Sequence, residues 1–510
     1  MIPTWILVLV SYLIYYVYNF YKKVAKYPPG PTPLPLIGNL HQLEAHNTHK
    51  QFERWSKVYG PVFTVFFPAP TVIITQLPEI KEALIKKGDI FIDRPQGPVP
   101  ELFMCVENGG VISSSGSSWR EQRRFAVHTL RDFGMGRNVM EEKIMNSVET
   151  LFEQLDGTVA AESLDMNWPI ELCVGNIINE LLLGYHWRAD DCEKFVHFKK
   201  GLDFLFREMR ERKSVMLVHS YPWLKHMPYI GYIGWRELRE SMNNIYGFMA
   251  SEVEEHKKHL DYDSEPTDFV GAYLQELKRR EHKGESTEDF TERNLVNTLS
   301  DFWMAGMETT ATTLRWAILF LIAHQDVQKK MQKEIDDVVG RDRRPTMADK
   351  MNMPYSSAVV MEIQRKANIL TFNLPRCTSA DTEIGGHSIP AGTSIFPQIT
   401  SVLDGQESFD DPDRFDPTRF LGSDGKTFNK TAMDCLVPFS LGKRQCAGES
   451  LARMELFLIL VSLVHRYSFD VPKGGSMPDL TPVFGSTQTP LPSARATPTY
   501  GGSIGHERGA

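Results

Sequence analysis

Apolar side chains recur every three or four positions along most of the chain, which is the spacing that gathers them on one face of an α-helix. Alternation with a period of two is confined to short pieces, and the runs Val62–Phe67 and Thr71–Thr75, separated by Pro68 and Pro70, predict a small β-hairpin. We find no internal repeat. The pattern predicts a mainly α body with minor β. Helices are expected over Arg120–Leu130, Val139–Leu155, Leu172–Leu183, Trp235–His259, Thr291–Val339, Ser356–Ala367 and Glu449–Tyr467.

The first 21 residues carry a different pattern, an uncharged apolar run. About 20 such residues cross the hydrocarbon core of a bilayer. Lys22, Lys23 and Lys26 follow at once, and positive charge on that side keeps it in the cytoplasm. Because no small-residue cleavage site follows, we predict an uncleaved membrane signal anchor over residues 1–21. A secretory signal peptide that is removed is the alternative.

The rest of the chain divides by composition. Residues 22–49 are basic and rich in proline, which restricts φ and excludes helix, so they predict an extended linker. Residues 50–492 form the predicted catalytic domain, and the polar residues 493–510 a flexible tail. The aromatic segment Val215–Trp235 is too interrupted by Pro and Gly to span a bilayer. It predicts either a surface that enters the membrane interface or a buried helix–loop–helix.

Charge and cysteine content narrow the partners. The formal net charge is -8 and the basic residues form no long run, so we predict that the chain does not bind nucleic acid. The six cysteines show no paired spacing, which favours a reducing compartment over a disulfide framework. The catalytic part is therefore expected to face the cytosol.

The sharpest candidate for chemistry is Cys446, which directly precedes an apolar helix. A helix N-terminus lowers the pKa of a thiol, and the thiolate is the form that binds iron. Gly442 and Gly448 are expected to let the backbone pass close to a flat ligand, and Arg444 to pair with a carboxylate. An isolated cysteine is more often a small buried hydrophobe, which is the alternative.

The run from Phe439 to Gly448, FSLGKRQCAG, contains every fixed position of FxxGxRxCxG and resembles the signature of the cytochrome P450 family. Microsomal animal members that oxidise drugs, steroids and fatty acids are the most similar group. The resemblance covers about residues 28–490 and implies a triangular helical body with small β-sheets. Haem would lie between the long central helix and the helix after Cys446, with Cys446 as the iron ligand and Phe439 and Gly442 beside the cofactor.

Glu362 and Arg365 lie three residues apart on one predicted helix, and alone they would form a surface ion pair worth about 0.2–0.5 kcal/mol. They resemble the ExxR element of the family, and Pro417–Phe420 resembles its PERF element, with Thr418 in place of Glu. The resemblance implies that Glu362, Arg365 and Arg419 form a buried structural network.

The segment from Ala305 to Thr310, AGMETT, lies in the middle of a long predicted helix. A threonine hydroxyl there can bond back to the carbonyl one turn earlier. Taken alone, these are ordinary helix residues. They resemble the oxygen-binding element of the family, which implies that Ala305 and Gly306 border the haem. Thr309 would then orient the water that protonates dioxygen, and Glu308 would feed protons to it.

Trp119 and Arg123 resemble the WxxxR element, whose side chains meet a haem propionate; an amphipathic helix with an exposed basic face is the alternative. Arg376 occupies the place of a second propionate ligand in the family. With Arg444 these residues would neutralise two carboxylates whose unpaired burial is costly.

The substrate pocket is expected, from positions in the family, to be lined by apolar side chains that favour a lipophilic substrate. Fatty acids, eicosanoids, steroids and foreign compounds all remain open. The expected lining residues are Phe302, Met304, Leu370, Phe372 and Phe484.

The resemblance implies a monooxygenase of the endoplasmic reticulum that uses haem b and inserts one oxygen atom of O2 by hydroxylation or epoxidation. The chain has no GxGxxG, flavin or Fe–S motif, so electrons are expected from NADPH through a separate reductase, with cytochrome b5 and membrane lipid as further partners. Two alternatives remain: an enzyme that rearranges peroxides without external electrons, and a non-enzymatic haem-binding membrane protein.

Overall fold

The computed structural model describes residues 3–44, 47–134, 138–156, 165–188, 190–229, 234–471, 474–485, 487–491 and 497–500. The α-helices are α1 Thr4–Val24, α2 Thr48–Tyr59, α3 Leu77–Lys81, α4 Pro98–Leu102, α5 Gly116–Asp132, α6 Asn138–Asp156, α7 Asn167–Leu183, α8 Glu193–Glu211, α9 Lys213–Ser220, α10 Arg236–His259, α11 Phe269–Lys283, α12 Glu292–Ala323, α13 Gln325–Val339, α14 Pro354–Ala367, α15 Thr400–Leu403, α16 Lys430–Cys435 and α17 Glu449–Arg466. The strands are β1 Val62–Phe67, β2 Ala69–Ile74, β3 Arg376–Cys377, β4 Thr382–Ile384, β5 His387–Ile389, β6 Ser394–Pro397, β7 Tyr467–Asp470 and β8 Thr497–Tyr500. The predicted mainly α fold with minor β is confirmed.

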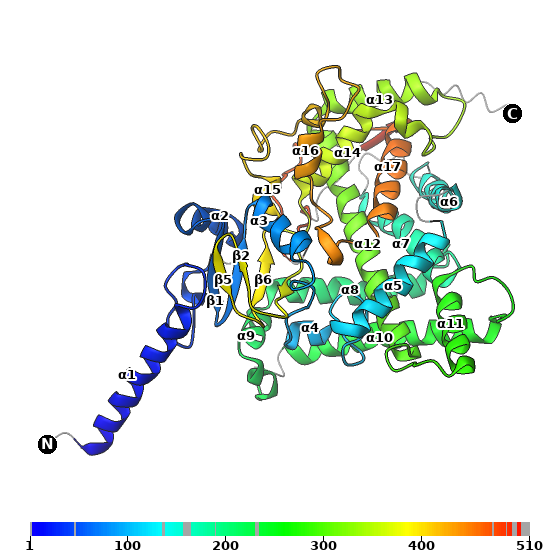
Figure 1. Ribbon diagram of the computed structural model, residues 1–510. Helices are drawn as coiled ribbons and strands as arrows, with labels where there is room; N and C mark the ends of the chain where they lie inside the picture. Colours follow the sequence, from blue (N-terminus) through cyan, green and yellow to red (C-terminus); the bar gives the residue numbers. More distant parts are fainter. Residues whose placement is uncertain are drawn as a thin grey trace.

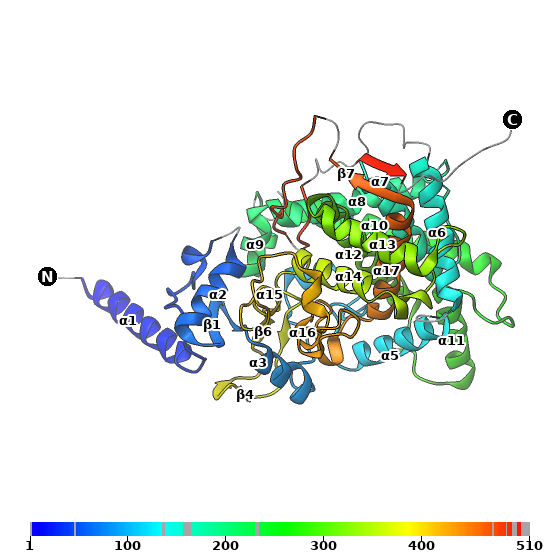
Figure 2. The same cartoon turned by 90° about the horizontal axis from the view of Figure 1, so that it is seen from above.

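The largest sheet lies at one end of the molecule, beside α2, and the helices gather at the other end (Figures 1 and 2). Its strand order is β1-β2-β6-β3. The predicted hairpin forms its edge, with β1 antiparallel to β2 and Val62 opposite Ile74. Strand β6 joins β2 in parallel and β3 in antiparallel fashion, so the chain after α14 returns to the sheet. This return places Arg376 of β3 at the border between sheet and helices.

Helix α1 projects away from the body and buries none of its residues (Figure 1). Among the described residues it is the one helix long and apolar enough to cross a membrane by length and composition. Its C-terminal end touches the body, because the Tyr21 hydroxyl donates to Pro33 O at 3.2 Å and the rings of Phe20 and Phe66 lie 6.2 Å apart. An apolar helix exposed to water along its length requires another environment to cover it.

The central helix α12 crosses the middle of the helical body (Figure 1) and is buried over most of its length. The predicted single helix over Thr291–Val339 is wrong, since α12 ends at Ala323 and α13 begins at Gln325. Side-chain amides explain the break: Gln325 donates to Ile322 O at 3.1 Å, and Gln328 donates to Leu321 O at 3.3 Å. These bonds satisfy carbonyl groups that a continuing helix would have paired.

The aromatic segment predicted over Val215–Trp235 comprises the end of α9 and a 3₁₀ turn; residues 230–233 lie outside the described residues. Its apolar side chains divide between two faces: Trp223 and Tyr229 are 60% and 80% exposed, whereas Val218 and Leu224 are buried in the core. The Tyr221 hydroxyl donates to Leu36 O at 3.1 Å, which ties the segment to the linker after α1. The described part of the segment therefore has an exposed apolar surface on one face and a buried face on the other, so each of the two alternatives holds for part of it.

The predicted tail, residues 493–510, contains one described element. Strand β8, Thr497–Tyr500, pairs with β7 in antiparallel register, with Tyr467 opposite Tyr500. The other residues of the tail lie outside the described residues. Thr497–Tyr500 is therefore attached to the body as a strand, for which its Thr and Tyr residues are suited, and the flexibility of the tail stays a prediction.

Candidate functional site

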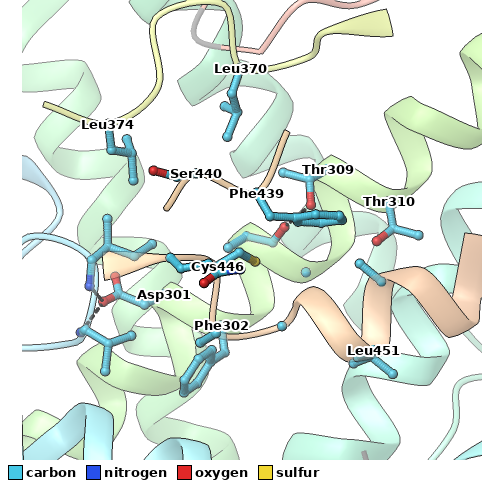
Figure 3. Close-up of a pocket in the computed structure, with 18 of the residues that line it drawn as sticks. Asp301, Phe302, Thr309, Thr310, Leu370, Leu374, Phe439, Ser440, Cys446 and Leu451 are labelled. Carbon is cyan, nitrogen blue, oxygen red and sulfur yellow. Dashed lines mark hydrogen bonds between the residues drawn. The ribbon is translucent and has the colours of Figure 1, made fainter. Parts of the chain in front are cut away.

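A large cavity lies between α12, α7, the start of α17 and the loop that carries Cys446 (Figure 3). Its volume is about 1540 Å³ when its open mouth is included. The lining is mostly apolar and includes four arginine side chains. The predicted site residues that line it are Phe302, Ala305, Gly306, Thr309, Leu370, Arg123, Arg376, Phe439, Arg444 and Cys446.

Cys446 lies in the loop directly before α17, and its Sγ faces the cavity (Figure 3). Its backbone N–H donates to Phe439 O at 3.0 Å, which closes the loop beneath the cavity. Burial raises the pKa of the thiol, although the backbone N–H of Gly448 and the guanidinium of Arg123 oppose this. Lowering of this pKa by the helix N-terminus stays a prediction, and the loss of hydration acts in the opposite direction.

Gly442 and Gly448 have different surroundings. Gly448 lines the cavity as predicted, whereas Gly442 lies against the backbone of Leu84. Gly442 has a φ of 75°, and a Cβ there would lie 1.9 Å from Leu84 O. Its expected place beside the cofactor is therefore wrong, since its glycine is required by a turn and by a close approach of two chain segments.

Thr309 has the predicted back-bond. Its Oγ1 donates to Ala305 O at 2.7 Å, one turn earlier on the cavity side of α12. Gly306 lies in the same turn, and a Cβ there would lie 2.5 Å from the Cδ1 of Ile178 on α7. The glycine therefore allows α12 to pack closely on α7 where Thr309 faces the cavity.

Glu308 lies on another face of α12 and does not line the cavity. Successive residues on an α-helix are turned by about 100°, so neighbours in sequence face different directions. Thr312 Oγ1 donates to Glu308 Oε1 at 3.4 Å, and burial raises the pKa of this carboxyl although the ammonium of Lys199 and the guanidinium of Arg315 oppose the change. Glu308 therefore does not reach the cavity in this arrangement, and its role in feeding protons to the water held by Thr309 stays a prediction.

Four guanidinium groups of the cavity lining lie close enough together to repel one another. Three were predicted, Arg123, Arg376 and Arg444, and the fourth is Arg94, which sequence reasoning missed. Carbonyls hold them in place: Arg444 Nε donates to Ile92 O at 2.7 Å, and Arg94 Nε donates to Ile112 O at 2.8 Å. No local signal marks Arg94, because it lies in an extended stretch far from the other three in sequence.

The charge of this guanidinium cluster is not neutralised within the described residues, where none of the four forms an ion pair with a carboxylate. Burial and mutual repulsion lower the pKa of Arg376 to about 9 and that of Arg444 to about 8. Buried unpaired charge is costly. The site therefore fits a ligand that brings negative charge, such as the two propionates of haem.

Trp119 is a second indication that the guanidinium cluster binds an anionic group. Its side chain is 4% exposed, and its ring lies 3.9 Å from the guanidinium carbon of Arg444. Its Nε1 has no hydrogen-bond partner among the described residues. A buried donor beside the guanidinium cluster fits an anionic group of the ligand, because buried polar groups are nearly always paired.

Asp301 is a further cavity residue that sequence reasoning missed. Its Oδ2 accepts hydrogen bonds from the backbone of Val111 at 2.7 Å and Ile112 at 3.0 Å (Figure 3). Burial raises its pKa to about 7. Its spacing in the sequence could have identified it as a cavity residue, since Asp301 lies four residues before Ala305 and eight before Thr309 on one helix face. It fastens the loop between α4 and α5 to α12.

Glu362, Arg365 and Arg419 meet beneath the site. Arg365 donates to Glu362 from Nε and Nη2, each at 2.8 Å, and Arg419 Nε donates to it at 3.2 Å. The side chains of Glu362 and Arg365 are fully buried, so the pair is not the surface ion pair that spacing alone suggested. The backbone N–H of Asp416 adds a fourth bond to Glu362 at 2.8 Å. The network joins α14 to the meander before α16.

The expected substrate-contacting residues separate into two groups. Phe302 and Leu370 line the cavity. Met304 is buried in the main core on another face of α12, and Phe372 packs on Phe484 with ring centroids 5.5 Å apart, away from the lining. These three expectations are wrong, because sequence neighbours of cavity residues turn to other faces of their elements.

Comparisons with known proteins agree with this geometry. The Cytochrome P450 family matches residues 28–493. Cytochrome P450 2C55 of Rattus norvegicus is 38% identical over 87% of this chain and 88% of its own length. Cytochrome P450 2C44 of Mus musculus is 37% identical over 86% and 87%, and Cytochrome P450 2H2 of Gallus gallus is 37% identical over 90% of both. A match of this extent, on a chain whose loop thiol and guanidinium cluster face one cavity, shows that the protein belongs to the cytochrome P450 family.

Proposed function

We propose that the cavity binds haem b, with Cys446 Sγ as the iron ligand and the guanidinium cluster on its propionates. The chain is a haem-thiolate monooxygenase that inserts one oxygen atom of O2 into a lipophilic substrate, with electrons from NADPH through cytochrome P450 reductase. The observation that carries the residue assignments is the unneutralised guanidinium cluster, which lines the same cavity as Cys446.

Different side chains around the cavity have different roles in this function. Arg376 and Arg444 neutralise carboxylates that would otherwise be buried unpaired, and Trp119 Nε1 donates to the same groups. Cys446 is placed to bind the metal as a thiolate, and a thiolate-ligated haem supplies the activation of dioxygen when it is bound. The apolar wall around Phe302 keeps bulk water from the reacting atoms.

Thr309 orients a proton donor. Its O–H is committed to Ala305 O at 2.7 Å, so the oxygen presents its lone pairs to the cavity. A water in the cavity can therefore donate to Thr309 and be held in one orientation. This arrangement positions a proton at the cavity-facing turn of α12, where the reaction requires it.

The substrate is a lipophilic molecule. Apolar side chains form most of the wall, and the cations that line the cavity in the described part of the chain belong to the guanidinium cluster. Hydroxylation or epoxidation of a fatty acid, an eicosanoid, a steroid or a foreign compound fits such a wall.

The protein is anchored in the membrane of the endoplasmic reticulum by α1, with the catalytic domain on the cytoplasmic face. The exposed apolar surface around Trp223 and Tyr229, tied to the linker at Leu36, enters the lipid interface. Cytochrome b5 is proposed as a second electron donor.

Reconstitution of the full chain with reductase and NADPH tests the function. A fatty acid, a steroid and a synthetic ether that yields a fluorescent product are tested separately as substrates. At least one is expected to give an oxygenated product whose formation requires NADPH. Thr309→Val is compared with Thr309→Ser, which keeps the hydroxyl. We expect Thr309→Val to consume NADPH but to form about 100-fold less product, the lower end of the contribution of a group that positions a proton. Rearrangement of an organic peroxide without NADPH, with no NADPH-dependent product, would favour the isomerase alternative.

A further inference from the structure

Glu455 is a buried carboxyl group that the proposed mechanism does not use. It lies on α17 among the apolar residues Met454 to Val464, is 1% exposed, and lines the cavity. Its Oε2 accepts a hydrogen bond from Thr310 Oγ1 at 3.0 Å. Its Oε1 has no hydrogen-bond partner among the described residues. A carboxyl group with one bond in an apolar helix interior is costly unless it has a purpose.

The surroundings of Glu455 favour its protonated form. Burial raises its pKa to about 8, and the Thr310 hydroxyl only partly opposes this. Within the described residues, α12 presents that hydroxyl and α7 presents the buried thiol of Cys173. The other elements packed on α17, namely α6, α13, α14 and β7, present no charged group that acts on the carboxyl. Glu455 therefore holds its proton near neutral pH.

Thr310 links this carboxyl to the reacting side of the cavity. It follows Thr309 in sequence, and both hydroxyl-bearing residues line the cavity (Figure 3). Glu308, the acidic residue next to Thr309 on α12, lies outside the lining. The carboxyl that reaches the cavity side of this helix turn is consequently that of Glu455.

Protonation changes what Glu455 can do. An ionised carboxylate only accepts hydrogen bonds, so Thr310 must donate to it, whereas a protonated carboxyl can donate to Thr310 and release the threonine O–H. The two states therefore hold the turn of α12 in different hydrogen-bonded arrangements.

We propose that Glu455 is a positioning residue of the oxygenase reaction, and that its proton determines how Thr310 is hydrogen-bonded and thereby how the adjacent Thr309 holds water in the cavity. This inference rests on the proposed function, because it assigns Glu455 to the proton delivery of the same site. Its consequence is a dependence on pH of coupling, the product formed per NADPH consumed.

Coupling measured at pH 7 and pH 9 with saturating reductase tests the proposal. The protonated fraction of a group with a pKa of about 8 falls about tenfold over this interval, so the wild-type chain is expected to lose coupling by about that factor. In Glu455→Gln, which cannot ionise, the ratio between the two pH values is expected to stay close to one. Glu240→Gln on the exposed face of α10 is the matched control and should keep the wild-type ratio. An unchanged ratio in Glu455→Gln, with product still formed, would overturn the proposal and leave the proposed function intact.

Infrared spectroscopy of the full chain in detergent provides a test that does not depend on activity. A protonated-carboxyl band that disappears as the pH is raised through about 8, and that is absent in Glu455→Gln, is expected. If Glu455→Gln leaves the protonated-carboxyl bands unchanged, the assignment is refuted.

Should Glu455→Gln not fold, Thr310→Val and Thr310→Ser replace it in the coupling measurement. The serine variant is expected to keep the pH dependence of coupling, and the valine variant is expected to lose it. Equal behaviour of the two variants would contradict the role of Thr310. If no chain forms product, the proposed function fails and the infrared band still decides whether Glu455 holds a proton.

Discussion

Replacement of Glu362 by Gln tests the buried network beneath the cavity. The carboxylate is fully buried and accepts four hydrogen bonds, two from Arg365, one from Arg419 and one from the backbone of Asp416. A glutamine keeps the volume but removes the charge, and its NH₂ group faces donors. Arg419 then loses its counter-charge, and Arg365 keeps only the carboxylate of Asp404, which lies 3.9 Å from its Nη1.

The expected loss is large because the surviving charges remain buried. Removing one partner of a buried ion pair costs about 3–5 kcal/mol, mostly as the penalty on the charge left behind. The surface pair of Arg236 and Glu240, whose side chains are 65% and 57% exposed, provides the control. Breaking an exposed pair of this helical spacing costs about 0.3–0.5 kcal/mol. The loss in free energy of unfolding should therefore be about tenfold larger for Glu362→Gln than for Glu240→Gln.

Urea unfolding of the full chain in detergent, followed by tryptophan fluorescence and circular dichroism, measures the difference. The midpoint is expected to fall for Glu362→Gln and to stay near the wild-type value for Glu240→Gln, with the slope unchanged in both. Free energies of unfolding that agree within about 1 kcal/mol for the two variants would refute the reasoning. Such a result would mean that water or a rearranged meander satisfies Arg365 and Arg419.

Three further predictions concern the cofactor, pH and the membrane. Arg376→Leu should lower the haem content per chain several-fold, whereas Arg124→Leu on the exposed face of α5 should not; equal haem content would contradict the propionate assignment. Asp301 has a pKa raised to about 7 when folded, so its unfolded carboxyl binds fewer protons and stability falls from pH 4 to pH 7 by up to about 4 kcal/mol. Asp301→Asn should flatten that decline in urea midpoints, and an unchanged pH dependence would refute it. Deletion of residues 1–24 should make the chain extractable from membranes by alkaline carbonate, and retention would contradict anchoring by α1.

Short spacings in the sequence predicted much of the site because the structure keeps them on one element. Cys446 and Arg444 share one loop, and the back-bond from Thr309 to Ala305 lies within one turn of α12. The hydrophobic periodicity located the helices for the same reason, since an apolar stripe depends only on neighbours along the chain.

Contacts between residues far apart in the sequence could not be predicted from it. Arg94 joins the guanidinium cluster through carbonyls of a distant loop, and Glu455 is recognisable only once α17 packs on α12 at Thr310. Helical phase explains why Met304 and Glu308 lie outside the cavity lining, because a motif fixes sequence neighbours without showing which of them faces the cavity. The break at His324 likewise depends on glutamine side chains that bond the carbonyls at the end of α12.

The reduced, carbon monoxide-bound minus reduced difference spectrum of the full chain tests the central claim most directly. The wild-type chain and Cys435→Ser, which alters a thiol outside the cavity lining, should both give the strongly red-shifted Soret band of a thiolate-ligated haem. Cys446→Ser should lose that band, because the cavity then offers iron no thiolate. A histidine-type haem spectrum in the wild-type chain, or an unchanged band in Cys446→Ser, would contradict the assignment of Cys446 as the iron ligand.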